Sequence, residues 1–163
     1  MAKLKIITGV DDPILRAVAE PVEKFDAGLK KLAKRMKEAM VEAKGLGIAA
    51  PQVGESVRLF LTVLNYDTPH ETALAMVNPK IIAHGNEEVL GEEGCLSVPG
   101  VYDKVLRHSE ISVEFFDLDG TKHVLQLSGL NARVVQHELD HLNGVLFVDK
   151  VEKNSKKMGG VVM

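Results

Sequence analysis

The chain has 163 residues, a length that suits one domain with a single buried core. Charged residues make up 26% and the formal net charge is −3. The composition therefore excludes the strongly positive electrostatic potential that attracts nucleic acids or anionic membranes. No run of about 18 apolar residues is present, and the start, MAKLKIITG, lacks the apolar segment of a signal peptide. We therefore expect no membrane span, no direct nucleic-acid binding and a cytoplasmic location.

The first clear element is an amphipathic helix over residues 26–43. Its apolar residues recur at helical spacing, lysines occupy the opposite side, and Gly45 follows as a stop signal. Buried or alternating apolar runs then predict strands, and the last two of them are joined by the Asp-Gly turn of DLDG into a hairpin. These strands are 57–64, 78–85, 110–117 and 121–129.

A second helix is predicted over residues 130–144, where LNARVVQHELDHLNG ends at Gly144. Because apolar residues cover a wide arc of this helix, we expect it to run through the core. The fold class is then α+β, with antiparallel β-sheets packed around a central C-terminal helix and an N-terminal amphipathic helix beside them. Residues 1–150 are expected to form one domain, and residues 151–163 a flexible tail.

The second helix carries the pattern H-E-x-x-H as His137, Glu138 and His141. Two imidazoles one turn apart can converge on one metal ion, and the glutamate can reach a water on that ion without being a ligand. The competing interpretation is a helix with two histidines that bind nothing. In peptidases with the longer pattern H-E-x-x-H-x-x-G-x-x-H the third ligand lies six residues beyond the second, but this position is Phe147. The pattern alone leaves the third ligand open.

EEGCLSVPG, residues 92–100, contains the only cysteine of the chain, Cys95. The glycine before it and the Ser-Val-Pro after it indicate a loop or strand end, where the thiol could face a site. Thiolate is a favourable ligand for zinc and iron. A single cysteine is otherwise most often buried filler.

GLGIAAPQVG, residues 45–54, combines glycines and alanines with one amide side chain, Gln52. A backbone with so few side chains permits close approach to a ligand. By itself the stretch could equally be a glycine-rich turn whose glutamine is solvated.

Together, GLGIAAPQ, EGCLS and QHELDH resemble, in this order, the three signature motifs of the peptide deformylases. The resemblance extends from DDPILRAVAEPVEKFD near the start to GVLFVD at 144–149. It implies that Cys95, His137 and His141 hold one divalent metal, Fe2+ in preference to Zn2+, Ni2+ or Co2+. The implied substrates are N-formyl-methionyl nascent polypeptides, met at the ribosome, from which formyl is removed as formate.

The resemblance also implies roles for other residues. Glu138 would move the proton of the attacking water, while the Gln52 amide and the backbone N–H of Leu96 would stabilise the negative charge that develops on the formyl oxygen. We expect the peptide to lie along the glycine-rich backbone and the methionine side chain to enter an apolar pocket. The expected substrate-binding residues are Gly45, Leu46, Gly47, Ile48, Gly94, Tyr102 and Val134.

Two residues beside these motifs, Glu93 and Arg107, resemble positions that support the cysteine loop, but an ordinary surface ion pair would fit them as well. Two other functions also fit the motifs. One is a zinc peptidase, and the other is a metal-stabilised peptide-binding module without turnover.

Overall fold

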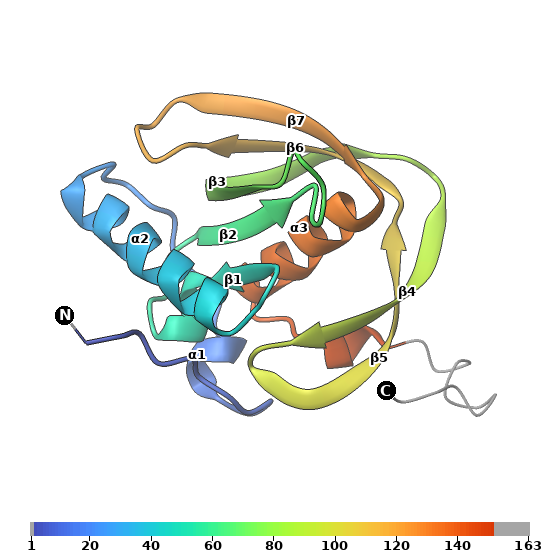
Figure 1. Ribbon diagram of the computed structural model, residues 1–163, viewed down its shortest axis with the longest axis horizontal. Coiled ribbons are helices and arrows are strands. Elements are labelled where there is room, and N and C mark those ends of the chain that lie inside the picture. The colour runs from blue at the N-terminus through green and yellow to red at the C-terminus, as the bar shows by residue number, and fades with distance from the viewer. Residues whose placement is uncertain (1, 152–163) are drawn as a thin grey trace.

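The computed structural model describes residues 2–151 and is shown in Figure 1. Three α-helices, two 3-10 helices and seven strands occur within this range. In chain order they are α1 (Pro13–Arg16), α2 (Ala27–Glu42), β1 (Gly47–Ala49), η1 (Ala50–Val53), β2 (Leu59–Leu64), β3 (Thr72–His84), β4 (Glu88–Cys95), β5 (Val98–His108), β6 (Glu110–Phe116), β7 (Lys122–Ser128), α3 (Gly129–Leu142) and η2 (Phe147–Lys150).

The strands form two antiparallel sheets. Five of them pair in the order β1-β2-β3-β6-β7, and the remaining two pair as the long hairpin β4-β5. Helix α3 lies between the five-stranded sheet and the hairpin (Figure 1). This arrangement confirms the predicted α+β class and the central position of the C-terminal helix.

Helix α2 has the boundaries that its sequence predicts. It starts at its N-cap Asp26, whose carboxylate accepts a hydrogen bond from the backbone N–H of Leu29 at 3.0 Å. Its apolar face packs against β1 and β2, where Met36 and Met40 are fully buried. The lysines lie on the exposed face, as expected for an amphipathic helix.

Helix α3 is buried on most sides. Val135 and Leu142 pack with Phe60 of β2 and Phe115 of β6 in one apolar cluster. On another side, three polar side chains of the same helix, His137, Glu138 and His141, are also buried. Burial of polar groups on this scale is unfavourable unless each has a partner or a ligand, so it marks this side of α3 as a functional site.

The structure corrects one predicted strand and adds a hairpin that the sequence pattern does not predict. The strand expected at 78–85 is the second half of β3, which begins at Thr72. Asn78 has a positive φ of 49°, and the pairing of β3 with β6 shifts register beside it. The apolar alternation is interrupted at this residue, so the sequence pattern indicates only the second half of the strand. The hairpin β4-β5 is not predicted, because about half of its residues are exposed and polar residues, Glu93, Asp103 and Arg107, occupy buried positions, so the strands show no apolar periodicity.

The expected flexible tail lies almost entirely outside the described residues. Its first residue, Val151, makes a bridge to Val105 of β5. No helix within residues 2–151 is long and apolar enough to cross a membrane.

Candidate active site

Three potential metal ligands converge beside the buried polar side of α3. His137 and His141 are one helical turn apart, and Cys95 is the last residue of β4, where the pairing with β5 shifts register. Their ligand atoms all lie within 4.8 Å of one another, and the Sγ of Cys95 is 3.2 Å from the Nε2 of His141. The predicted third ligand therefore comes from the hairpin rather than from the helix.

The cysteine sulfur is surrounded by hydrogen-bond donors. The backbone N–H of Ser97 lies 3.4 Å from the sulfur, and the Nε2 of Gln52 lies 3.7 Å from it. Two donors therefore hold the sulfur in place beside the rings of His137 and His141.

The pKa values of the two histidines are shifted in opposite directions. Burial acts to lower the pKa of His137, but the sulfur of Cys95 and the carboxylate of Glu93 outweigh burial and raise this pKa to about 10. Burial and the neighbouring charge of His137 hold the pKa of His141 well below its ordinary value. Burial thus favours the neutral ring of His141, which is the form that can bind a metal. One thiolate and two imidazoles are donors that suit Fe2+, Zn2+, Ni2+ or Co2+, so these residues fit a divalent transition metal.

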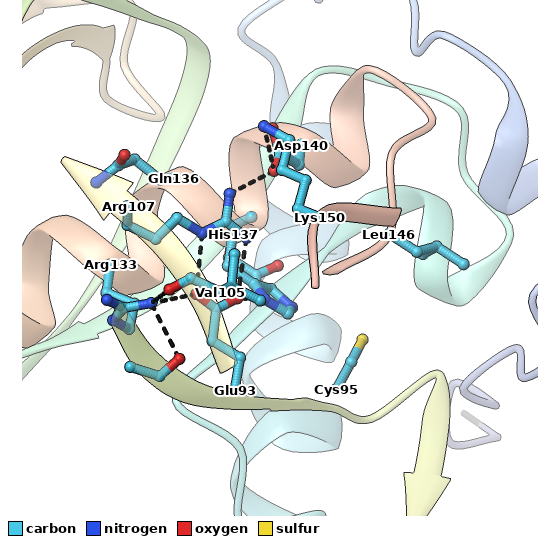
Figure 2. Close-up of polar contacts among 12 residues, drawn as sticks. Glu93, Cys95, Val105, Arg107, Arg133, Gln136, His137, Asp140, Leu146 and Lys150 are labelled. Atoms are coloured by element: carbon cyan, nitrogen blue, oxygen red, sulfur yellow. Dashed lines mark hydrogen bonds and ion pairs between the residues drawn. The ribbon is translucent and has the colours of Figure 1, made fainter. Parts of the chain in front are cut away.

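A buried carboxylate orients His137. The Nδ1 of His137 donates to the Oε1 of Glu93 at 2.8 Å, so its Nε2 faces the ligand cluster. Arg107 donates to both oxygens of Glu93 at 2.9 Å and also contacts Asp140 (Figure 2). Burial acts to raise the pKa of Glu93, but Arg107 and His137 outweigh it and hold the pKa at about 2. The side chains of Glu93 and Arg107 are 5% and 3% exposed, so the alternative of a surface ion pair is wrong.

Glu138 lies beside the ligand cluster without belonging to it. Its Oε1 is 4.0 Å from the Nε2 of His137, and its Oε2 has no hydrogen-bond partner among residues 2–151. A Cβ on Gly47 would lie only 2.6 Å from the Oε1 of Glu138, so the bare backbone of β1 is what admits this carboxylate. Burial raises the pKa of Glu138 to about 7. A carboxylate with this pKa can both accept and return a proton near neutral pH.

Both ends of the Gln52 side chain are held. Its Oε1 accepts from the backbone N–H of Ala49 at 2.8 Å, and its Nε2 donates to the Oγ of Ser97 at 3.0 Å. The amide is almost fully buried. The alternative in which Gln52 is a solvated turn residue is therefore wrong, because the side chain is buried and its Nε2 donates to Ser97 and faces the sulfur of Cys95.

A cleft of about 470 Å³ opens onto these groups. Its lining includes Gln52, Leu96, His137 and Glu138. Among the seven residues that we expected to bind substrate, six also line it: Gly45, Leu46, Gly47, Gly94, Tyr102 and Val134.

The seventh, Ile48, does not line the cleft. Successive side chains of a strand point to opposite faces. Gly47 faces the cleft, and Ile48 therefore points the other way, where it is fully buried among residues of α2 and β2. The expectation that Ile48 binds substrate is therefore corrected for its side chain, which faces away from the cleft.

Sequence reasoning missed two residues of this site. Ser97 fixes the amide of Gln52, and its only signal was its position in EGCLS. Arg133 also lines the cleft and contacts Glu93. Its signal was a basic residue one position before the apolar pair Val134 and Val135 of the motif helix.

Comparisons with known proteins agree with this geometry. The polypeptide deformylase family matches residues 4–157. The peptide deformylase of Rhizobium meliloti is 40% identical over 155 residues, which are 95% of this chain and 89% of that protein. That of Prochlorococcus marinus is 46% identical and covers 90% of this chain and 73% of the relative. The crystal structure of peptide deformylase from Thermotoga maritima superimposes with a TM-score of 0.87 at 40% identity, covering 93% of this chain and 99% of that one.

Proposed function

The chain belongs to the polypeptide deformylase family of metal-dependent enzymes, and we propose that it removes the formyl group from the N-terminal formyl-methionine of new polypeptides. The products are formate and a free α-amine. One observation carries the assignment of the reacting centre: the ligand atoms of Cys95, His137 and His141 lie within 4.8 Å of one another, and Cys95 and His137 line the cleft.

Cys95, His137 and His141 would hold the metal, and Glu93 supports this role by fixing the ring of His137. A divalent cation at this position supplies a Lewis acid that polarises the formyl carbonyl and lowers the pKa of water. We favour Fe2+, and Zn2+, Ni2+ and Co2+ accept the same donors.

Glu138 is proposed as the base and acid of the reaction. It takes a proton from the water that attacks the formyl carbon and delivers this proton to the leaving nitrogen when the C–N bond breaks. Burial of the carboxylate and its pKa of about 7 support both halves of this role.

Gln52 and the backbone N–H of Leu96 are proposed to stabilise the oxygen of the formyl group. This oxygen becomes negative when water adds to the carbon, and fixed donors favour that state without having to reorient. The support is that the Gln52 amide is held at both ends and that Leu96 directly follows the ligand Cys95.

We place the peptide along the backbone of residues 45–48. Within the described residues 2–151, β1 is an edge strand that pairs only with β2, so we place an extended chain along its other side. Val134 and Leu96 then line the pocket for methionine, and Tyr102 stands at the rim, where Gly94 leaves room for its ring. In this proposal the partners are N-formyl-methionyl chains that emerge from the ribosome in the cytoplasm.

The proposal is tested with protein purified without oxygen, a formyl-methionyl peptide and a formate assay. Removal of the metal by a chelator should abolish formate release. Glu138→Gln should lower kcat by about 10²- to 10⁴-fold while the metal content stays unchanged. Glu38→Gln, on the exposed face of α2, is the matched control.

Two outcomes would contradict the proposal. Cleavage of the unformylated peptide without formate release would indicate a peptidase. Binding of the peptide without any turnover, unaffected by Glu138→Gln, would indicate a binding module.

A further inference from the structure

Arg133 joins α3 to the hairpin β4-β5. Its Nη2 donates to the carbonyl of Val89 at 2.7 Å, and its Nη1 donates to the carbonyl of Val105 at 2.9 Å. These carbonyls belong to β4 and β5 respectively, so one guanidinium holds both strands of the hairpin. The same Nη1 donates to the Oε2 of Glu93 at 2.8 Å, and Figure 2 shows Arg133 beside this carboxylate.

A glycine makes room for the guanidinium. A Cβ on Gly91 of β4 would lie 2.8 Å from both the Cζ and the Nη2 of Arg133. The flat group therefore lies directly over the backbone of this glycine. The Nη1 of Arg133 also makes a long hydrogen bond of 3.4 Å to the carbonyl oxygen of Gly91.

The contacts of Glu93 show what Arg133 adds. Each carboxylate oxygen accepts two hydrogen bonds: Oε1 from His137 and Arg107, and Oε2 from Arg107 and Arg133. Without Arg133, Oε2 would lose one donor and the carboxylate could turn about its bonds to Arg107. The ring of His137 would then lose its fixed direction.

We infer that Arg133 is a positioning residue of the metal site. It fixes the Glu93 carboxylate that orients His137, and it holds the strand that ends in Cys95 against the helix that carries His137 and His141. The inference rests on the proposed function in one respect only, that these three residues are the metal ligands. Gly91 has a matching role, because it admits the guanidinium.

The first test replaces Arg133 with Met, which keeps an unbranched stem at the wall of the cleft but removes every donor. The affinity for Zn2+, measured by competition with a chelator, should fall about 10-fold, and the stabilisation of the folded protein by Zn2+ should fall by the corresponding 1.4 kcal/mol. Arg133→Lys should lose less of the Zn2+ affinity, since lysine keeps one charged donor group but cannot reproduce the several N–H donors of the planar guanidinium. Arg35→Met, which removes a hydrogen bond from Arg35 of α2 to the carbonyl of Ala2, should leave the affinity unchanged.

Cobalt reports on the geometry directly. In Co2+-loaded protein, the thiolate-to-cobalt charge-transfer band and the visible ligand-field bands should shift or weaken in Arg133→Met. A residue that only stabilises the hairpin would lower the stability of the metal-free protein and leave these bands unchanged.

A double-mutant cycle with Gly91 tests the coupling. Gly91→Ala should displace the guanidinium and weaken Zn2+ binding several-fold in the wild-type background, but it should have no effect when Arg133 is already Met. Gly85→Ala is the matched control, because its Cβ would meet only ordinary contacts of 3.5 Å or more. If Arg133→Met does not fold, Arg133→Lys and Gly91→Ala carry the same test.

Wild-type Zn2+ affinity and unchanged cobalt bands in the Arg133 variants would overturn the inference. Equal effects of Gly91→Ala in both backgrounds would overturn it as well. In either case, formate release by the wild-type protein would leave the proposed function intact. Failure of the wild-type protein to bind Zn2+ or Co2+ would instead contradict the proposed function itself.

Discussion

Gly47→Ala should separate the metal site from the catalytic base. The added Cβ would lie 2.6 Å from the Oε1 of Glu138 and 2.8 Å from its Cδ. The backbone of β1 cannot retreat easily, because Gly47 pairs with Thr62 of β2 and the next residue, Ile48, is fully buried. The carboxylate must therefore move.

The size of this movement follows from the contact distances. Ordinary contact begins at 3.4 Å, so an oxygen now at 2.6 Å must retreat by about 0.8 Å. A misplacement of about 1 Å can reduce an enzymatic rate by about 10²-fold. We therefore expect kcat to fall by about 10²-fold, equivalent to about 2.7 kcal/mol of transition-state stabilisation.

The assay is formate release from a formyl-methionyl peptide, with metal content determined on the same samples. The metal should be retained, because a Cβ at residue 47 meets none of the ligands Cys95, His137 and His141 among its nearest atoms. In the Glu138→Gln background, Gly47→Ala should lower kcat only slightly further, since the base is already absent. A kcat within threefold of wild type in fully loaded Gly47→Ala protein would refute this account of Glu138.

Three other predictions concern separate parts of the molecule. Glu93→Gln should weaken Zn2+ binding by about 10- to 100-fold in a chelator competition, because a neutral amide orients His137 less firmly; unchanged affinity would contradict the role of Glu93. Gln52→Ala should lower kcat by about 10²- to 10³-fold in the formate assay without loss of metal, and an unchanged kcat would exclude Gln52 as the oxygen donor group. The hydrogen bond from Arg16 lowers the pKa of Asp149 below 3.8, so this pair stabilises the fold above that pH and the contribution is lost as pH falls below it. The difference in unfolding midpoint between wild type and Asp149→Asn should therefore be larger at pH 6 than at pH 3.

The fold was predictable where one face of an element is buried. Helix α2 and the hairpin β6-β7 show apolar residues at the period of their structure, and their boundaries follow from Asp26 and from the DLDG turn. The hairpin β4-β5 was not predictable in this way. It is held by long-range contacts, such as those of Arg133 on α3, and these leave no periodic signal in β4 or β5 themselves.

The site shows the same division. The pattern H-E-x-x-H identified His137 and His141 because their spacing is a local property of a helix. Glu93 could be named as a candidate, but its burial and its bond to His137 depend on a fold that brings β4 against α3. The side chain of Ile48 points away from the cleft, and this direction likewise depends on which face of β1 is covered by helix α2.

The most direct test of the central claim is X-ray absorption spectroscopy at the metal edge of protein purified without oxygen. The account predicts one sulfur ligand at about 2.3 Å together with nitrogen ligands, and loss of the sulfur signal in Cys95→Ala. A folded, metal-loaded wild-type protein whose metal shows no sulfur neighbour would contradict the convergence of Cys95, His137 and His141 on one ion.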